Sequence, residues 1–307
     1  MKSARPVASV AGAFAYKVPR RDCLVALDVV RACIALLLPC TTELWAVYAP
    51  IALLQCGSAA FTPTFQATIP DVVADETEYT RALSLSRLAY DLEALASPVL
   101  AAVLLTLFDF HWLFAGTAFG FIASAGLVRA TALPSPVPPD ASQGVWRRTT
   151  QGVRDYLATP SPRAVLALNL AVAASGAMVL VNTIVVIRGT LGFSDHEVAW
   201  ALAAYGAGSM LAALALPRLL VRFPDRILMI LGACLVAVCM AAGPLALAWL
   251  GSLLALWMLA GLGHSLVTTP VGRIIRRSAT PGERPALFAA QFALSHACWL
   301  VTYPLAG

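Results

Sequence analysis

Residues 217–242 read PRLLVRFPDRILMILGACLVAVCMAA, so a turn with three arginines is followed by sixteen residues that carry no charge. A membrane-spanning helix needs about 20 predominantly apolar residues. Eight further long apolar runs are separated by charged or proline-rich segments, at 24–39, 44–65, 83–108, 112–133, 164–187, 198–219, 245–267 and 286–304. The sequence therefore predicts an all-α fold, a polytopic membrane helix bundle with about nine full spans.

The composition also indicates a membrane protein. Of the 307 residues, 60% are hydrophobic and 12% are charged, whereas soluble proteins average about 45–50% and about 25%. So few charges cannot cover a water-soluble globule, and we expect the apolar surface to face the lipid bilayer. The net charge of +5 comes from basic residues dispersed between apolar runs, so nucleic acid is not an expected partner.

The basic residues indicate the orientation. All 21 lysines and arginines except Arg31 and Arg188 fall on loops of one side of the predicted bundle. Membrane proteins carry such an excess on their cytoplasmic loops. We therefore expect a multi-pass protein of the cell (plasma) membrane with its N-terminus in the cytoplasm.

One long polar stretch divides the chain. Residues 132–163 contain the segment PSPVPPD at 134–140, which is typical of an extended linker. The prediction is an N-terminal helical bundle at 1–131, a cytoplasmic linker at 132–163 and a C-terminal helical bundle at 164–307.

Ionisable side chains inside the predicted spans each need a partner or a role, because a charge at mid-bilayer costs about 2.5–3.5 kcal/mol on insertion scales. Asp28 and Arg31 are three residues apart, and Arg87 and Asp91 are four apart, which is the spacing of ion pairs along a helix. Both pairs are also candidates for gating or coupling. Glu93 has no oppositely charged residue on its face within a turn, which makes it the leading coupling candidate, with an interhelical hydrogen bond as the alternative.

The sequence shows no pattern typical of a catalytic or metal site. The seven cysteines lack C-x-x-C spacing, and no glycine loop is followed by Lys-Ser or Lys-Thr to bind a phosphate. The acidic segment 71–78 lacks the glycine and the spacing of a calcium loop. We expect no enzyme activity and no cofactor, so active transport would draw on an ion gradient or an outside partner.

Residues 12–21, GAFAYKVPRR, resemble the loop pattern G-x-x-x-D-R-x-G-R-R of the major facilitator superfamily. Tyr16 stands where that pattern has aspartate, and the matching positions are Gly12, Lys17, Arg20 and Arg21. Residues 208–226 resemble the same loop in the second half of the chain, through Arg218, Asp225 and Arg226. The resemblance implies that these loops pair charges between helix ends and close the cytoplasmic side.

A second resemblance lies at residues 93–102, EALASPVLAA. It is similar to the exporter pattern G-x-x-x-G-P-x-x-G-G of the same superfamily, with small residues or proline at Ser97, Pro98, Ala101 and Ala102. Ordinary packing of small residues between helices is the alternative. Residues 82–97, ALSLSRLAYDLEALAS, look most like bacterial exporters of the siderophore and macrolide type.

The resemblance covers almost the whole chain and implies a major-facilitator-like architecture of two bundles, truncated at both ends. Its implied function is secondary transport, with export of amphipathic small molecules by alternating access. Ion (proton) coupling is a candidate energy source, and Leu53 stands where proton-coupled relatives have an arginine, which argues against the usual proton route. The alternative is a truncated remnant that does not transport, or a partner for another membrane protein.

Five polar residues in the second half are candidates for lining a substrate cavity. The resemblance places three of them on helices near the central cavity of such transporters, and the set is Asn169, Asn182, His264, Gln291 and His296. A histidine there could titrate near neutral pH. Polar contacts between helices and hydrogen-bonded structural histidines are the alternatives.

Overall fold

The structure is a computed structural model that describes residues 19–41, 43–133, 145–246 and 249–307. All regular structure in these residues is helical. Seven segments of this described part are long and apolar enough to cross a membrane, namely Arg20–Cys40, Phe110–Ala130, Pro160–Thr190, Asp195–Arg222, Asp225–Leu245, Leu250–Ser278 and Arg284–Ala306. The predicted all-helical class is confirmed.

The prediction of about nine full spans is not confirmed, because two predicted runs are not among the seven segments. These runs correspond to α3 (Leu44–Val72) and α4 (Glu76–Leu107). Both helices are long enough to cross a bilayer, but six charged residues lie between Glu76 and Glu93 in α4. In α3, three prolines, two glutamines, one serine and three threonines lie among the apolar residues.

The chain folds as two compact units. Unit 1 comprises residues 1–73, 99–155 and 279–290, and unit 2 comprises residues 74–98, 156–278 and 291–307. The helices α4, α6 (Val145–Ala158) and α12 (Arg284–Ala306) therefore contribute residues to both units.

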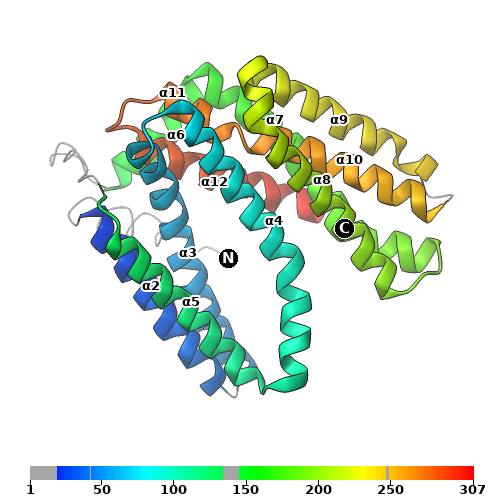
Figure 1. Cartoon of the computed structure of the whole chain (residues 1–307), viewed down its shortest axis with the longest axis horizontal. Helices are drawn as coiled ribbons and strands as arrows, with labels where there is room; N and C mark the ends of the chain where they lie inside the picture. The colour runs from blue at the N-terminus through cyan, green and yellow to red at the C-terminus, as the bar shows by residue number, and fades with distance from the viewer. Residues whose placement is uncertain (1–18, 42, 134–144, 247–248) are drawn as a thin grey trace. The chain divides into compact units, whose positions relative to one another are not determined.

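In unit 1, α2 (Arg20–Leu37) packs along α3 and α5 (Phe110–Ala130), as Figure 1 shows. A short helix, η1 (Leu38–Cys40), follows α2. The contact between α2 and α5 is built from small buried residues, Ala32 and Ala35 against Ala118. Small side chains allow the two backbones to approach closely.

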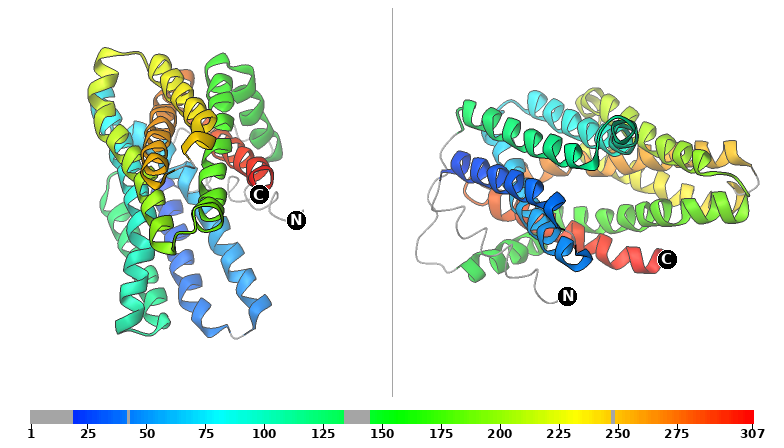
Figure 2. Two further views of the ribbon diagram at one scale, coloured as in Figure 1. Left: turned by 90° about the vertical axis from the view of Figure 1, so that its right-hand side faces the viewer. Right: turned by 90° about the horizontal axis from the view of Figure 1, so that it is seen from below.

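Unit 2 is built around α10 (Leu250–Thr268), which packs against both α8 (Asp195–Arg222) and α9 (Asp225–Ala246). Figure 2 shows α9 and α10, in yellow and orange, side by side. The other helices of this unit are α7 (Pro160–Ile184), its π-helical continuation η2 (Val185–Thr190), and α11 (Val271–Ser278). Ser194 and Glu197 form a capping box that fixes the start of α8.

The helices α8 and α10 touch backbone to backbone at two glycines. A Cβ atom added to Gly208 would overlap the carbonyl oxygen of Met258, and one added to Gly261 would overlap that of Tyr205. Only glycine fits at either position. This contact aligns the polar side chains that α8 and α10 carry.

Many large apolar side chains are exposed along the spans. Phe119 and Leu127 on α5 are 73% and 71% exposed, and Val238 on α9 is 64% exposed. An apolar surface of this extent needs a lipid environment. The protein is a multi-pass membrane protein.

Candidate functional site

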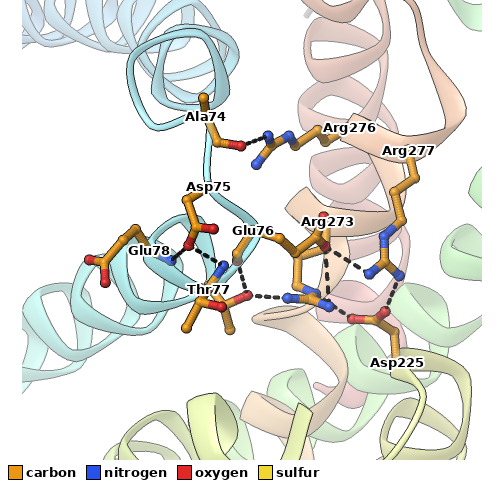
Figure 3. A network of polar contacts seen from close by, with 10 residues as sticks. Ala74, Asp75, Glu76, Thr77, Glu78, Asp225, Arg273, Arg276 and Arg277 are labelled. Carbon is orange, nitrogen blue, oxygen red and sulfur yellow. Dashed lines mark hydrogen bonds and ion pairs between the residues drawn. The ribbon is translucent and has the colours of Figure 1, made fainter. Parts of the chain in front are cut away.

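A cluster of charged side chains connects the first residues of α4 and α9 to α11 (Figure 3). We call it the loop-end network, and it consists of Glu76, Thr80, Asp225, Arg273 and Arg277. Asp225 is buried and accepts from Arg273 Nε at 2.7 Å and from Arg277 Nη1 at 2.6 Å. The same two arginines reach Glu76 through their Nη2 atoms, at 3.2 Å and 2.7 Å.

Local helix structure explains why these groups meet. Arg273 and Arg277 are four residues apart on α11, so they lie on one face. Asp225 and Glu76 each lie in the first turn of a helix, where the macrodipole stabilises negative charge. Asp75 caps α4 by accepting from the backbone N–H groups of Thr77 and Glu78, both at 2.9 Å (Figure 3).

A similar arrangement lies in unit 1. Asp71, near the end of α3, is bound on one oxygen by Arg20 of α2 and on the other by Arg284 of α12, the latter at 3.0 Å. In each unit, therefore, one aspartate forms ion pairs with two arginines. Arg20 belongs to the predicted first loop motif, and its partner is Asp71.

The remaining loop-motif residues are placed differently. Arg21 is exposed and lies 3.7 Å from Asp22, and Gly12 and Lys17 are outside the described residues. Arg218 and Arg226 are exposed, and within the described ranges neither forms an ion pair. Of the second motif, only Asp225 enters the loop-end network.

A second polar cluster in unit 2 joins α4 to the spans α8 and α10, and we call it the intramembrane cluster (Arg87, Asp91, Tyr205, Ser209 and His264). The Arg87–Asp91 ion pair expected from the spacing is present, with Nη2 2.8 Å from Oδ1. Arg87 Nε also donates to Ser209 Oγ on α8 at 3.1 Å. One turn before Ser209, the Tyr205 hydroxyl is hydrogen-bonded to His264 Nδ1 of α10 at 2.8 Å.

The intramembrane cluster links three helices. Asp91, Ser209 and His264 are buried, and Tyr205 is half-buried. The His264 ring also lies near the Trp299 ring of α12, with centroids 6.5 Å apart. Among the predicted cavity residues, His264 is the one that this cluster includes.

The Asp28–Arg31 ion pair expected from the spacing is present in unit 1. Arg31 Nη2 binds Asp28 Oδ1, and both side chains are buried. The guanidinium also lies over two rings, 4.2 Å from the centroid of Phe61 and 4.5 Å from that of Phe121. Such stacking stabilises a cation inside a protein.

The other predicted cavity residues make local or interhelical contacts. Asn182 Nδ2 donates to the Ala306 carbonyl at 2.8 Å, and Gln291 Oε1 accepts from the Tyr156 hydroxyl. His296 is exposed, with Nδ1 2.7 Å from the Phe292 carbonyl on its own helix. Asn169 is buried, and its Nδ2 has no hydrogen-bond partner among the described residues.

Glu93 is exposed, and it forms no ion pair or hydrogen bond within the part of the chain that the structure describes. Its coupling role stays a prediction. Of the exporter-like motif, Ser97 is exposed and Ala101 is half-buried, whereas the side chains of Pro98 and Ala102 lie outside the described part. The described residues contain no group of three or more His, Cys, Asp or Glu that could hold a metal ion.

Sequence reasoning missed several residues of these sites. Glu76, Asp71, Arg273, Arg277 and Arg284 were not singled out as site residues, and neither were Tyr205 and Ser209. The segment VGRIIRRS at 271–278 carries the signal for two of them, because it places basic residues four apart at the end of an apolar run.

The chain is similar to transporters in sequence and in fold. The profile of a major facilitator family described as transmembrane secretion effector matches residues 6–270. No curated protein sequence matches the chain.

The solved structures that share the fold include three transporters. The Escherichia coli fucose:proton symporter is 11% identical, with a TM-score of 0.72 over 97% of this chain and 79% of that chain. The human organic anion transporter TETRAN is 14% identical, with a TM-score of 0.74 over 97% and 73%. A bacterial homologue of the iron transporter ferroportin, in an outward-facing state, is 14% identical, with a TM-score of 0.67 over 98% and 81%. These likenesses and the family match favour a membrane transporter over an enzyme or a non-transporting remnant.

Proposed function

Because the chain belongs to the transmembrane secretion effector family of the major facilitator superfamily, we propose that it is a secondary transporter that exports an amphipathic small molecule across the plasma membrane. The description of the family as a secretion effector supports export over uptake. In this proposal residues 1–131 and 164–307 act as two bundles, residues 132–163 form the cytoplasmic linker, and the N-terminus lies in the cytoplasm.

The observation that carries the proposal is the intramembrane cluster. Arg87 of α4 donates to Ser209 of α8, and the Tyr205 hydroxyl is bonded to His264 of α10. Ionisable side chains inside membrane spans are costly and commonly mark substrate or ion pathways. A substrate that exchanged for one of these bonds would alter the packing of α4, α8 and α10, which links binding to a conformational change.

The loop-end network supports alternating access, which requires contacts that hold one end of a transporter closed and can also open. Arg277 is half exposed, so its bonds to Asp225 and Glu76 exchange with water at modest cost. Arg273 is buried, and breaking its contacts leaves charges without partners. We therefore expect Arg277 to release first when this end opens, with Arg273 as the stronger restraint.

An ion gradient is the energy source in this proposal. The sequence has no phosphate-binding glycine loop followed by Lys-Ser or Lys-Thr. The fold shared with the fucose:proton symporter is in keeping with proton coupling. Plasma-membrane location and the cytoplasmic N-terminus rest on the distribution of arginines over the loops.

Accumulation of amphipathic cations in a susceptible bacterial host tests the proposal. Cells that express the full chain should accumulate less ethidium, rhodamine and tetraphenylphosphonium than cells with an empty vector, and a protonophore should abolish the difference. Equal accumulation of all three probes, with the chain present in the membrane fraction, would contradict export of this class of molecule.

Two serine variants form a matched pair for the same measurement. Ser209→Ala removes the hydroxyl that binds Arg87 across helices. Ser175→Ala removes another buried hydroxyl, whose one hydrogen bond among the described residues is to the Val172 carbonyl of its own helix, at 2.9 Å. We expect Ser209→Ala to weaken export and Ser175→Ala to leave it unchanged. Equal export by the two variants would contradict a role of the intramembrane cluster in transport.

A further inference from the structure

The turn that joins α8 to α9 in unit 2 carries three exposed arginines. Only Phe223 and Pro224 separate the two helices (Figure 1). Arg218 and Arg222 are four residues apart at the end of α8, and Arg226 lies in the first turn of α9. None of the three side chains forms an ion pair, a hydrogen bond or a ring contact with a residue that the structure describes. We call this group the turn arginines (Arg218, Arg222 and Arg226).

The described carboxylates in the first turns of α4 and α9 are already engaged. Asp225 and Glu76 belong to the loop-end network. Glu78 pairs with Arg81, and Asp75 caps α4. These helix starts therefore supply no free acid to the turn arginines, and the anion that balances three exposed positive charges has to come from the surroundings.

Trp200 indicates the depth of the turn arginines in the membrane. It precedes Arg218 by 18 residues on α8, which is five helical turns, so the two residues share a face and lie about 27 Å apart along the axis. The hydrocarbon layer is about 30 Å thick. Trp200 is 58% exposed, as is typical of tryptophans at the membrane–water interface. The turn arginines therefore lie at the level of the lipid headgroups of the opposite leaflet.

Exposed apolar side chains continue from the turn arginines into the hydrocarbon layer. On α8, Leu211 and Leu214 are exposed on the face that carries the two arginines of that helix. On α9, Ile230 and Leu231 are exposed about one turn after Arg226. Each helix thus presents positive charge at the headgroup level and an apolar face beside it.

Buried leucines hold the two helix ends together. Leu216 of α8, Leu228 of α9 and Leu266 of α10 belong to one apolar cluster. The backbone that carries the turn arginines is therefore fixed before a ligand binds, which lowers the entropy that binding costs.

We propose that the turn arginines bind the headgroup of an anionic phospholipid. Their guanidinium groups donate to the phosphate oxygens, which they match in charge and in hydrogen-bonding geometry, and the acyl chains lie along the exposed faces of α8 and α9. A soluble acidic protein would match the charges but would not reach the apolar faces within the bilayer. The site stands independently of the export function proposed above, since it involves no residue of the intramembrane cluster.

Lipid titrations followed by native mass spectrometry test the proposal on the detergent-purified full chain. We expect the wild type to retain phosphatidylglycerol. The double variant Arg218→Gln/Arg222→Gln should bind it about 25-fold more weakly, because each arginine at a membrane surface contributes about a fivefold change in affinity. Phosphatidylcholine has the same phosphate group but no net charge, and it should bind weakly and equally to both proteins.

The double variant Arg81→Gln/Arg188→Gln is the matched control. It removes the same amount of charge from two exposed arginines of unit 2 that have partners, Glu78 at 2.6 Å and Asp195 at 3.2 Å. We expect it to bind phosphatidylglycerol like the wild type. Equal affinities of the two double variants, whether both are high or both are low, overturn the proposal.

Soluble anions separate a lipid from other ligands of the same charge. Glycerol phosphate has the phosphate group without acyl chains, and polyglutamate represents an acidic protein. Neither should displace phosphatidylglycerol from the wild type at equal concentration. Displacement by glycerol phosphate would identify an anion site without lipid, displacement by polyglutamate would favour a protein partner, and either result overturns the proposal.

Two further measurements apply if Arg218→Gln/Arg222→Gln does not fold. Arg218→Lys/Arg222→Lys keeps the charges but loses the planar fork, so its affinity for phosphatidylglycerol should be lower than that of the wild type. In the wild type, high salt should release the lipid, because salt screens exposed charges. Unchanged affinity in the lysine variant together with binding that does not depend on salt would overturn the proposal.

Discussion

Nε of Arg273 lies 2.7 Å from Oδ1 of Asp225, and residue Arg273 is only 6% exposed. Arg277 binds the other oxygen of the same aspartate while half exposed. Two arginines one turn apart thus contact one carboxylate from environments of different polarity. The two contacts should therefore differ in their contribution to stability.

Arg273→Ala should destabilise the protein far more than Arg277→Ala. Removing one partner of a buried pair costs about 3–5 kcal/mol, whereas exposed pairs contribute about 0–1 kcal/mol. Thermal unfolding of the detergent-purified variants measures the difference. Arg81→Ala is the control, because the one ion pair of Arg81 within the described ranges is with exposed Glu78 on its own helix. Equal melting temperatures for Arg273→Ala and Arg81→Ala would contradict the assignment.

Gly208→Ala should prevent correct packing of α8 on α10, because its methyl group would overlap the carbonyl oxygen of Met258. Gly126→Ala on α5 has no atom within 4 Å of the new methyl group. It should be neutral or stabilising, since alanine is favoured over glycine in helices by about 0.5–1 kcal/mol. Yield and monodispersity in size-exclusion chromatography distinguish the two variants, and similar behaviour would refute the close contact.

Tyr205→Phe should lower the melting temperature and weaken export. The change leaves buried His264 without its partner hydroxyl, and an unsatisfied buried polar group costs about 1–3 kcal/mol. Tyr48→Phe is the control, because Tyr48 is 66% exposed. If ethidium export and melting temperature are the same in both variants, the hydrogen bond has no role in stability or transport.

Glu283, which lies just before the span α12, should make the stability of the protein depend on pH. The backbone N–H and hydroxyl of Thr280 donate to its Oε2 at 3.0 Å and 2.8 Å, which lowers the pKa of Glu283. Because the pKa of Glu283 is lower in the folded protein, its ionised form stabilises the fold at any pH above the pKa in the unfolded chain, about 4.3. This contribution to the free energy of unfolding is lost as the pH falls through the pKa of the folded protein. The melting temperature of the wild type should therefore exceed that of Glu283→Gln at neutral pH. This difference should vanish in strong acid, and a difference that grows on acidification would contradict the assignment.

The local parts of the structure were predictable from the sequence. The seven spans follow from the lengths of apolar runs, and the pairs Asp28–Arg31 and Arg87–Asp91 follow from helical spacing. The prediction of two further spans is not confirmed, because α3 and α4 are not among the seven segments.

The long-range contacts were not predictable from one sequence. Arg273 reaches Asp225 across 48 residues and Thr80 across 193, and Tyr205 reaches His264 across 59. Periodicity indicates which face of a helix is polar, but it does not identify the helix that this face meets. The division into 1–131, 132–163 and 164–307, and the coupling and cavity roles of the individual residues, stay predictions.

The glycine contact between α8 and α10 also limits how these helices can move. Rotation of either helix about its own axis would drive a side chain into the opposing main chain at Gly208 or Gly261. We therefore expect α8 and α10 to tilt together as one rigid body. Any rotation of a helix about its own axis during a conformational change should occur in the neighbouring helices.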